Sequence, residues 1–340
     1  MKIPMKFPRR EFLRLGAAVA AAPALPRWAS AQSTSAPSTQ TTWPTRVVRL
    51  IVGFPPGGGA DAAARIAANR LSEIWGQQVV VENKGGAGGN IAHDTAAHAA
   101  PDGYTMLFSP SSLPIMPMLY ASLNYDPMTD LMPISLLGKY PNLIVVSKTS
   151  PVNALKEFIA NAKADPGKVT FATPGIGTTP HLTAELFKKM AEIDLTHVPY
   201  RGVAAGAMSD LLTNRIDAMF NTTGSLLQAV RSGQVRGLAQ SSSQRSPLAP
   251  EIPTFAEAGV PGFNVSSWYG LFAPARTPRE IVTRMHDDVA KMLTEPETRK
   301  KYEVLGIEAA SATPEQLTAM MRGEIELWGP IVKAANIKGE

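Results

Sequence analysis

The chain has 340 residues, 44% of them hydrophobic, and this length suggests two domains at about 100–200 residues each. The net charge of +5 lies entirely in residues 1–31, which carry six basic side chains and one acidic one; the remainder has 27 of each and is neutral. A neutral chain lacks the basic surface that nucleic-acid binding requires, and a chain without cysteine has no disulfide framework or thiolate metal site.

The first 31 residues have the pattern of an export signal. The pair Arg9-Arg10 opens an apolar run of small residues that extends to about Leu25, and Ala29-Ser30-Ala31 matches the motif at which such signals are cleaved. We therefore predict that residues 1–31 are a twin-arginine signal peptide cleaved near Ala31, and that the mature protein lies in the periplasm. An ordinary export signal and an N-terminal amphipathic helix are the alternatives. Residues 32–43, rich in Ser, Thr, Gln and Pro, are predicted to form a flexible tether.

Strand-like and helix-like segments alternate through the rest of the chain, a pattern typical of α/β proteins with parallel sheets. Within residues 61–75, Ala63, Ala67 and Leu71 share one helical face, and Gly76 ends the segment. In the first half of the chain the predicted strands are 46–54, 79–81, 105–109 and 142–147, and the predicted helices are 61–75 and 94–100.

The second half repeats the alternation. Asn153, Thr277 and Thr313 are predicted helix N-caps, the last two followed by proline at the first helical position. A proline-rich segment over 245–263 is predicted to be a loop. The predicted strands are 168–172, 196–199, 216–220, 235–240 and 265–273, and the predicted helices are 154–165, 180–191, 203–214, 225–232, 278–303 and 314–335.

Two similar strand–loop–helix junctions stand far apart in the chain, at residues 53–61 and 173–179. Each places glycines where a strand passes into a helix, and glycine lets a ligand approach the backbone closely. A helix start presents unpaired N–H groups and about half a positive charge, which favours an anion. Two such loops facing one anion could bind it with micromolar affinity, about −8 kcal/mol, without a basic side chain. Two tight turns with a purely structural role are the alternative.

The first junction also fits the dinucleotide-binding fingerprint in outline, because Gly57 and Gly59 follow a strand and Glu82 ends the next strand. An exported enzyme or a dinucleotide-binding oxidoreductase is therefore an alternative, although the double proline before the glycines and the second junction argue against it. The sequence contains no nucleophile elbow, no phosphate-binding loop and no histidine pair at metal-ligand spacing. It thus predicts no catalytic residue, no cofactor and no metal.

Seven motifs, read in order over about residues 43–337, resemble those of Bug-type extracytoplasmic solute-binding proteins of tripartite tricarboxylate transporters. Each motif alone is weak evidence for the family, whereas the order and spacing of all seven are specific for it. The motifs are Pro56-Gly57-Gly58 with Asp61; Val81-Glu82-Asn83-Lys84 before Gly86-Ala87-Gly88-Gly89-Asn90; Pro101-Asp102-Gly103-Tyr104-Thr105; Gly175 and Gly177-Thr178 with His181-Leu182; Val198-Pro199-Tyr200-Arg201-Gly202; Pro253-Thr254 with Glu257-Ala258-Gly259; and Trp268-Tyr269-Gly270-Leu271-Phe272-Ala273-Pro274.

The resemblance implies an α/β fold like that of periplasmic binding proteins, with two α/β lobes joined by two crossover strands. Lobe 1 would comprise residues 44–140 and 265–340, and lobe 2 residues 141–264. The strands at 142–147 and 265–273 would be the hinges.

The resemblance also implies a function. The protein would be a binding protein and not an enzyme, working as a monomer without a cofactor. It would capture a small carboxylate, either a di- or tricarboxylate or an aromatic acid, by hinge closure and deliver it to an integral membrane permease. A sensor subunit that contacts a signalling receptor is an alternative partner role.

The ligand carboxylate would be held by the two glycine loops, one from each lobe. Asp61 either orients its loop or touches the ligand, and Thr178 either caps its helix or donates its hydroxyl to the carboxylate. The predicted ligand-binding residues are Phe54, Pro56, Gly57, Gly58, Gly59, Ala60, Asp61, Asn90, Ser109, Ser111, Thr173, Gly175, Gly177, Thr178, His181, Tyr200, Arg201, Asn221 and Trp268.

For three of these residues a structural role stands beside the functional one. His181 either packs beneath its loop or contacts the anion. Arg201 either pairs with a second carboxylate or forms a surface ion pair, and Trp268 is either a cleft wall or part of the hinge core. The sequence departs from the family pattern at Pro174, which removes an N–H donor, and at Asn221, where an aspartate is common. The lost negative charge at Asn221 would favour a more acidic ligand or relax a preference for an amino group.

Overall fold

The computed structural model describes residues 43–200 and 206–339. The predicted signal peptide, nearly all of the predicted tether and Arg201 lie outside the described residues.

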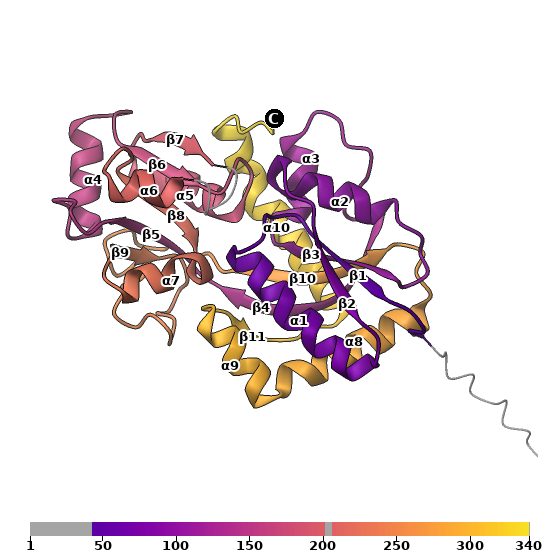
Figure 1. The fold of residues 1–340 in the computed structure, drawn as a ribbon. Helices are drawn as coiled ribbons and strands as arrows, with labels where there is room; N and C mark the ends of the chain where they lie inside the picture. Colours follow the sequence, from indigo (N-terminus) through magenta and orange to yellow (C-terminus); the bar gives the residue numbers. More distant parts are fainter. Residues whose placement is uncertain (1–42, 201–205, 340) are drawn as a thin grey trace, which may run out of the picture. The chain divides into compact units, whose positions relative to one another are not determined.

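The first sheet joins strands from both ends of the described chain, in the order β11-β4-β10-β3-β1-β2 (Figure 1). β1 runs parallel to β2 and β3, whereas β10 is antiparallel to β3 and to β4. Its strands are β1 (Val48–Val52), β2 (Val79–Asn83), β3 (Thr105–Pro110), β4 (Leu131–Tyr140), β10 (Ser267–Pro274) and β11 (Glu308–Ala309). The helices between these strands are α1 (Gly59–Trp75), α2 (Asn90–Ala97), α3 (Met116–Leu119), α8 (Arg279–Thr294) and α9 (Pro296–Val304), with short turns η1 (Ala87–Gly89) and η2 (Leu113–Ile115). A further helix, α10 (Pro314–Ala334), follows β11.

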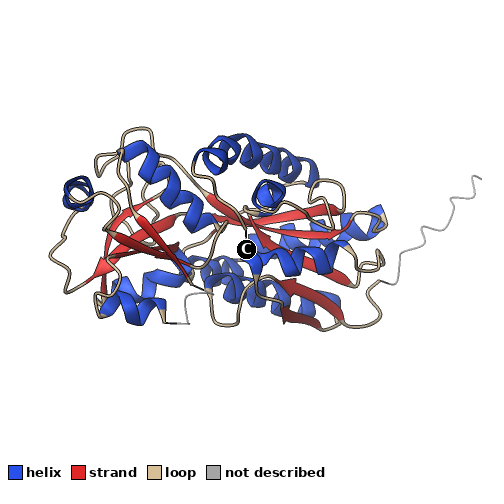
Figure 2. Ribbon diagram, turned by 90° about the horizontal axis from the view of Figure 1, so that it is seen from above, coloured by secondary structure: helices blue, strands red, loops and turns tan. Residues whose placement is uncertain are grey.

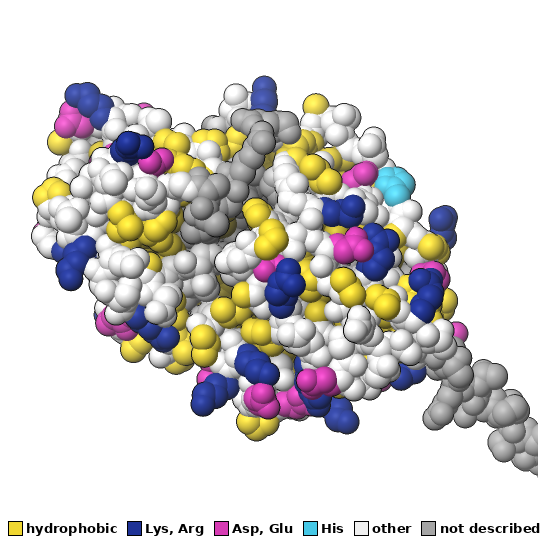
Figure 3. Space-filling view, in the orientation of Figure 1, with side chains coloured by type: hydrophobic (Ala, Val, Ile, Leu, Met, Phe, Trp, Pro, Cys, Tyr) yellow, Lys and Arg dark blue, Asp and Glu magenta, His cyan; other side chains and the backbone are white. Residues whose placement is uncertain are grey.

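The predicted apolar face of α1 packs as expected. Ala63, Ala67 and Leu71 are fully buried against strand residues such as Leu50, and Gly76 ends the helix in the left-handed conformation. On the surface nearby, Arg70 pairs with Glu295 at 2.6 Å. Basic and acidic side chains are intermixed on the face shown in Figure 3, in keeping with the neutral charge of the chain beyond residue 31.

The second sheet has the order β7-β6-β8-β5-β9, in which β6 runs parallel to β7 and β8 and β5 runs antiparallel to β8 and β9. Every residue of β5 is buried, which explains its continuous apolar sequence. Its strands are β5 (Asn142–Ser147), β6 (Thr170–Thr173), β7 (Thr196–Pro199), β8 (Ala218–Thr222) and β9 (Val235–Gln240), with helices α4 (Leu155–Ala164), α5 (Thr179–Ala191), α6 (Ala207–Leu212) and α7 (Thr223–Arg231). Figure 2 shows helices flanking both sheets.

The chain crosses between the sheets twice, at Pro141 between β4 and β5, and through residues 241–266 between β9 and β10. The fold prediction of two α/β lobes is therefore confirmed. The predicted hinge strands need a correction, because residues 142–147 form β5 inside the second sheet and β10 lies inside the first, so that the connections are Pro141 and residues 241–266. We call the first sheet with its helices the first lobe and the second sheet with its helices the second lobe. One correction concerns β4, for which no strand was predicted: Pro133 and Gly138 interrupt its apolar pattern, yet it pairs with β10 along its length.

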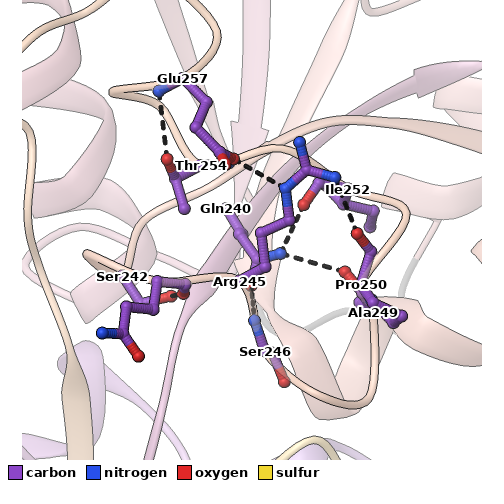
Figure 4. Close-up of polar contacts among 10 residues, drawn as sticks. Gln240, Ser242, Arg245, Ser246, Ala249, Pro250, Ile252, Thr254 and Glu257 are labelled. Atoms are coloured by element: carbon purple, nitrogen blue, oxygen red, sulfur yellow. Dashed lines mark hydrogen bonds and ion pairs between the residues drawn. The ribbon is translucent and has the colours of Figure 1, made fainter.

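The proline-rich loop between β9 and β10 is fastened by specific hydrogen bonds (Figure 4). The side-chain amide of Gln240 donates to the carbonyl oxygens of Ala249 and Ile252, at 3.1 and 2.6 Å. Arg245 pairs with Glu257 at 2.8 Å and donates to the Pro250 carbonyl at 2.9 Å. The return crossing is thus a folded segment that holds its own shape.

The hydrophobic core of the second lobe includes residues from helices of the first lobe. Met116 and Leu119 of α3, and Trp328 and Ile331 near the end of α10, belong to the apolar cluster of the second lobe. α10 therefore begins against β4 and ends against α5. The predicted lobe boundaries stay a prediction, and these packing contacts show that both lobes share α10.

The structure corrects two predicted caps and one helix. Asn153 does not cap α4: its side chain donates to the Pro151 carbonyl, and Ala154 stands at the N-cap. Thr277 likewise donates to the Pro274 carbonyl, so that Pro278 precedes α8. The predicted helix 278–303 is two helices because Pro296 starts α9. The cap at Thr313 is confirmed, as its side chain and that of Gln316 form a capping box.

Candidate functional site: a pocket lined by both lobes

A small pocket is lined by residues of both lobes, with a cavity volume of about 60 Å³. This volume is well above the about 10–15 Å³ that a cavity needs in order to hold one water molecule. Seven of the predicted ligand-binding residues line it: Phe54, Pro56, Gly58, Gly59, Ala60, Thr178 and Asn221.

Three helices begin at this pocket. Gly58 is the N-cap of α1, Thr178 of α5 and Thr222 of α7, and all three line the cavity. None of these helix starts has a side-chain cap. Because the first turn of a helix leaves N–H groups without acceptors and carries a partial positive charge, three such starts around one cavity favour an anion.

The loop before α1 is held by Asp61, a 3% exposed residue in the first turn of that helix. One carboxylate oxygen accepts the Gly57 N–H at 2.9 Å and the Arg65 guanidinium at 3.0 Å, and the other accepts the Asn83 amide at 2.8 Å. Burial alone would raise the pKa of Asp61, but the hydrogen bonds from Arg65, Gly57 and Asn83 lower it below its ordinary value. Asp61 and Gly57 do not line the pocket, and the Asp61 carboxylate ties the loop to α1 through Arg65 and to the end of β2 through Asn83.

Unlike the Gly57 N–H, the N–H groups at the start of α1 lie at the pocket. Gly59 donates weakly to the Ser225 hydroxyl of the second lobe at 3.4 Å. The Gly58 and Ala60 N–H groups have no acceptor within the described residues, and both residues line the cavity. They are the backbone donors that this loop can offer to a ligand.

The loop before α5 uses most of its polar groups internally, although the Thr179 N–H at the pocket has no acceptor within the described residues. Thr178 donates its hydroxyl to the Gly175 carbonyl at 2.7 Å, so that this proton is already engaged. The Gly177 N–H donates to His181 Nδ1 at 3.1 Å, and the Gly175 N–H donates to the Thr173 hydroxyl at 3.3 Å. Thr173, Gly175, Gly177 and His181 do not line the pocket.

Two histidines pack beneath this loop. The rings of His181 and His197 stack with centroids 4.1 Å apart, and His197 Nε2 lies 2.6 Å from the Thr173 hydroxyl. Burial lowers the pKa of both, that of His197 to about 4 and that of His181 well below its ordinary value. Both rings are therefore neutral at neutral pH, as the hydrogen bond accepted by His181 requires.

The start of α7 is a part of the pocket that the sequence did not predict beyond Asn221. Thr222 and Ser225 line the cavity, and their hydroxyl oxygens lie 3.0 Å apart. The side-chain oxygen of Asn221 accepts the Thr222 N–H at 2.8 Å. The segment Thr222-Thr223-Gly224-Ser225 begins at the last residue of β8 and opens α7, and a run of hydroxyl residues at such a strand–helix junction is the signal that could have found it.

Two tyrosines that the sequence did not predict form another wall. Tyr140 of β4 and Tyr269 of β10 stack with ring centroids 4.3 Å apart, and both line the cavity. Burial raises the pKa of Tyr269 to about 12 and that of Tyr140 well above its ordinary value. The remaining unpredicted lining residues are Pro55, Pro110, Pro174, Thr179 and Pro180.

The other predicted ligand residues do not line this pocket. Trp268 is 1% exposed and donates its indole N–H to Glu324 at 2.7 Å, as does Trp328 from α10 at 2.6 Å, which places Trp268 in the core. Elsewhere, four predicted residues make internal contacts: Asn90 accepts a hydrogen bond from Tyr125, Ser109 contacts His93, the Ser111 N–H donates to the Trp268 carbonyl, and Tyr200 donates to Asp210.

Within residues 43–200 and 206–339, no cluster of His, Cys, Asp or Glu side chains is arranged to hold a metal ion. In the same part of the chain, no helix has both the length and the apolar character needed to cross a bilayer.

The model of the tripartite tricarboxylate transporter family receptors, TctC, matches residues 63–337. The chain belongs to this family. Among curated relatives, it is 38% identical to a UPF0065 protein from the tcbD-tcbE intergenic region of a Pseudomonas species, over 89% of this chain and 91% of that protein. It is 36% identical to protein BugT of Bordetella pertussis, over 89% and 94%. The predicted resemblance to Bug-type proteins is thus confirmed.

Several solved structures are similar to this chain over most of its length. R. palustris Rpa4515 with adipate has a TM-score of 0.83 and 36% identity, and the periplasmic binding protein BugD has 0.81 and 34%; each match covers 87% of this chain and 99% of the other. MatC (Rpa3494) from Rhodopseudomonas palustris with bound malate has a TM-score of 0.78 and 32% identity, over 85% and 100%. The family and these neighbours are solute-binding proteins and not enzymes, which confirms the prediction of a binding protein.

Proposed function

We propose that this TctC-family protein is a periplasmic receptor that captures a small carboxylate between its lobes and delivers it to an integral membrane permease. The convergence of three helix starts on a pocket lined by both lobes is the observation that carries the proposal. Adipate and malate, bound by two neighbours at 36% and 32% identity, support a carboxylate as the ligand. The export-signal pattern of residues 1–31 supports the periplasm.

The ligand carboxylate would lie against the starts of α1 and α7. The Gly58 and Ala60 N–H groups donate from the first lobe, and the hydroxyls of Thr222 and Ser225 stand on the second. Each hydrogen bond to a charged group contributes about 1.5–3 kcal/mol. A few of them give the binding energy of a micromolar complex, about −8 kcal/mol, without a basic side chain.

Hinge closure would couple binding to delivery. The Gly59 N–H reaches the Ser225 hydroxyl across the pocket, so the lobes are in contact at this point. Ligand entry then requires the lobes to separate by rotation at the two crossings, Pro141 and residues 241–266. A carboxylate that touches both lobes stabilises the closed arrangement, and the permease would recognise that arrangement. Because the family is that of tripartite tricarboxylate receptors, the permease would be driven by an ion gradient rather than ATP.

Calorimetric titration of the purified protein tests the proposal. We expect small carboxylates to bind with micromolar affinity and to be recovered unchanged, whereas their neutral amides, which have the same shape, should not bind. Binding of the amides as tightly as the acids would overturn the carboxylate assignment. Chemical turnover of the bound acid would overturn the receptor role.

A further inference from the structure

We infer that Glu324 of α10 is a proton-binding site linked to ligand capture: the protein takes up a proton at this side chain when a carboxylate enters the pocket. The inference rests on the proposed function and adds a proton as a second ligand of the same binding event. It follows from the hydrogen bonds of Glu324, from its place beside the pocket wall and from the charge that the ligand brings.

The two carboxylate oxygens of Glu324 each accept an indole N–H. Trp268 of β10 donates to Oε1 at 2.7 Å, and Trp328, one turn further along α10, donates to Oε2 at 2.6 Å. Both tryptophans are 1% exposed; Trp268 packs in the core of the first lobe and Trp328 in that of the second. A partly buried acid is thus fixed between two neutral donors, which supply hydrogen bonds and no positive charge.

These surroundings favour the protonated form of the carboxyl group. Burial raises the pKa of Glu324 to about 7, and the two indole hydrogen bonds lower it only in part. At neutral pH, about half of the molecules therefore carry a proton on Glu324. Because the residue is partly exposed, water can deliver and remove this proton. A moderate change in the local potential is then enough to change how much proton the site binds.

The ionisable groups on the elements packed against α10 are exposed, in contact with one another or uncharged at neutral pH. α10 packs against β4, α5, α3 and η2, and it meets β10 through Trp268. α3 and η2 carry no ionisable side chain. Burial and the indole hydrogen bonds are therefore what set the proton affinity of Glu324. The exposed groups are Lys139 of β4, Lys189 of α5 and Glu315, Arg322, Glu326 and Lys333 of α10 itself; the groups in contact are His181, Glu185 and Lys188 of α5; and the uncharged groups are Tyr140 of β4 and Tyr269 of β10.

Glu324 stands beside the pocket wall that the stacked tyrosines form. Its partner Trp268 directly precedes Tyr269 in β10, and Tyr269 stacks on Tyr140. Both tyrosines line the cavity. The pKa of Tyr140 is raised above all by burial, and the negative charge of Glu324 is among the smaller causes. The charge of Glu324 therefore acts on a residue that lines the pocket.

A carboxylate in the pocket brings a further negative charge toward Glu324. Like charges repel each other in the low dielectric of a protein, so the approach of an anion raises the pKa of an acid. The ligand then binds more tightly where Glu324 is protonated, and binding draws a proton from solvent onto the carboxylate. If the pKa rises by about one unit, affinity grows about sixfold from pH 8.5 to pH 6.5, and about 0.4 proton is taken up at pH 7.

Calorimetric titration of the full chain in two buffers measures the proton uptake. Adipate and malate, whose carboxyl groups are ionised above pH 6.5, are titrated at pH 7 in PIPES and in Tris, which differ in their enthalpy of ionisation. We expect uptake of about 0.4 proton per ligand and about sixfold tighter binding at pH 6.5 than at pH 8.5. Binding without proton uptake overturns the inference and leaves the proposed function intact, whereas failure of both acids to bind overturns the two together.

Glu324→Gln tests whether the uptake belongs to this side chain. Glutamine has the same shape and does not titrate, so we expect no proton uptake and equal affinity at pH 6.5 and pH 8.5. Glu326→Gln is the matched control, because Glu326 is exposed on the same helix and its loss should leave the uptake unchanged. Uptake that persists in Glu324→Gln overturns the inference.

Trp328→Phe gives a second test, which keeps both the acid and an aromatic ring in the apolar cluster. The indole of Trp328 lowers the pKa of Glu324, so its removal should move the pH dependence of affinity toward higher pH. A loss of packing alone would lower the affinity at every pH without moving this dependence. Titrations between pH 6 and pH 9 locate its midpoint, and a midpoint equal to that of the natural protein overturns the inference.

Discussion

The two glycine loops at 53–61 and 173–179 look alike in sequence and differ in what they offer a ligand. In the first loop the Asp61 carboxylate takes the Gly57 N–H, and the Gly58 and Ala60 N–H groups are left at the pocket. In the second loop the Gly177 N–H is taken by His181. Of the second loop's residues at the pocket, Thr179 alone has an N–H group with no acceptor in the described part of the chain, so this loop offers one backbone donor where the first offers two.

Two prolines add to this difference between the loops. Pro174 and Pro180 line the pocket from the second loop, and neither has an N–H to donate. The missing donors are replaced by the start of α7, where Thr222 and Ser225 line the same cavity. The comparison teaches that glycine at a strand–helix junction permits anion binding, whereas the acceptors around the loop decide whether its N–H groups are free for a ligand.

The largest expected effect on ligand binding comes from placing a side chain at Gly58 in the first loop. Gly58 has φ −82°, which any residue adopts, and a Cβ built there meets only the Pro55 carbonyl oxygen, at 3.9 Å. Gly58→Val should therefore fold normally while its branched side chain blocks the free donors at the pocket. We expect carboxylate affinity to fall at least about a hundredfold, or about 2.8 kcal/mol. Calorimetric titration measures the loss, and thermal unfolding without ligand checks the fold.

The matching substitution in the second loop should act on stability instead. Gly177 has φ +73°, and a Cβ there would overlap the Leu119 side chain. Gly177→Val should lower the free energy of unfolding by about 2–4 kcal/mol, since both the left-handed backbone and the crowding cost energy. If Gly177→Val kept full stability and lost ligand binding while Gly58→Val still bound, the roles of the two loops would be reversed.

The next prediction concerns the pH dependence of stability, which should differ between substitutions in the two loops. The pKa of His197 is about 4 in the folded protein because of burial, against about 6.5 for an ordinary histidine. The unfolded chain thus binds more protons between these values, and stability falls as pH drops below about 6.5. His197→Gln removes this titration, so its loss of stability between pH 7 and pH 5 should be smaller than that of the natural protein by at most about 2 kcal/mol. Urea unfolding at the two pH values measures the difference.

The first loop supplies the control for this experiment. The pKa of Asp61 is lowered, so its stabilising contribution is present above the ordinary value of 3.8 and is lost only as pH falls below it. Asp61→Asn should therefore lower stability without changing the difference between pH 7 and pH 5. Equal pH dependence of stability in the natural protein and in His197→Gln would show that the titration of His197 does not contribute to it.

The sequence predicted the places of both loops and most of the elements around them, because glycines at strand ends and apolar periodicity are local signals. It could not show that His181 takes the Gly177 N–H, or that Asn83 from the end of β2 steadies Asp61, because these contacts depend on side-chain orientations in the folded chain. The sequence left Trp268 as either a cleft wall or part of the hinge core; it lies in the core, whereas its neighbour Tyr269 lines the pocket, since successive side chains of a strand point to opposite faces.

The place of Tyr140 in the pocket wall was not predicted, for a related reason. It ends β4, whose pattern Pro133 and Gly138 interrupt, and its place beside Tyr269 follows from the pairing of β4 with β10 rather than from its own sequence neighbours. The start of α7 was missed because it has one glycine among hydroxyl residues instead of a glycine-rich loop. A search for glycine-rich loops therefore finds only part of a ligand site that is built from three helix starts.

The smallest expected effect concerns that third helix start. Ser225 accepts the Gly59 N–H at 3.4 Å, a long hydrogen bond that joins the lobes, and its hydroxyl also contacts Thr222. A neutral hydrogen bond contributes about 0.5–1.5 kcal/mol, and a long one lies at the lower end. Ser225→Ala should therefore weaken carboxylate binding by about two- to fivefold, measured by calorimetric titration, with the unliganded stability nearly unchanged. A loss approaching that of Gly58→Val would mean that the Ser225 hydroxyl contributes as much to carboxylate binding as the first loop, and the anion would then be held about equally by both lobes.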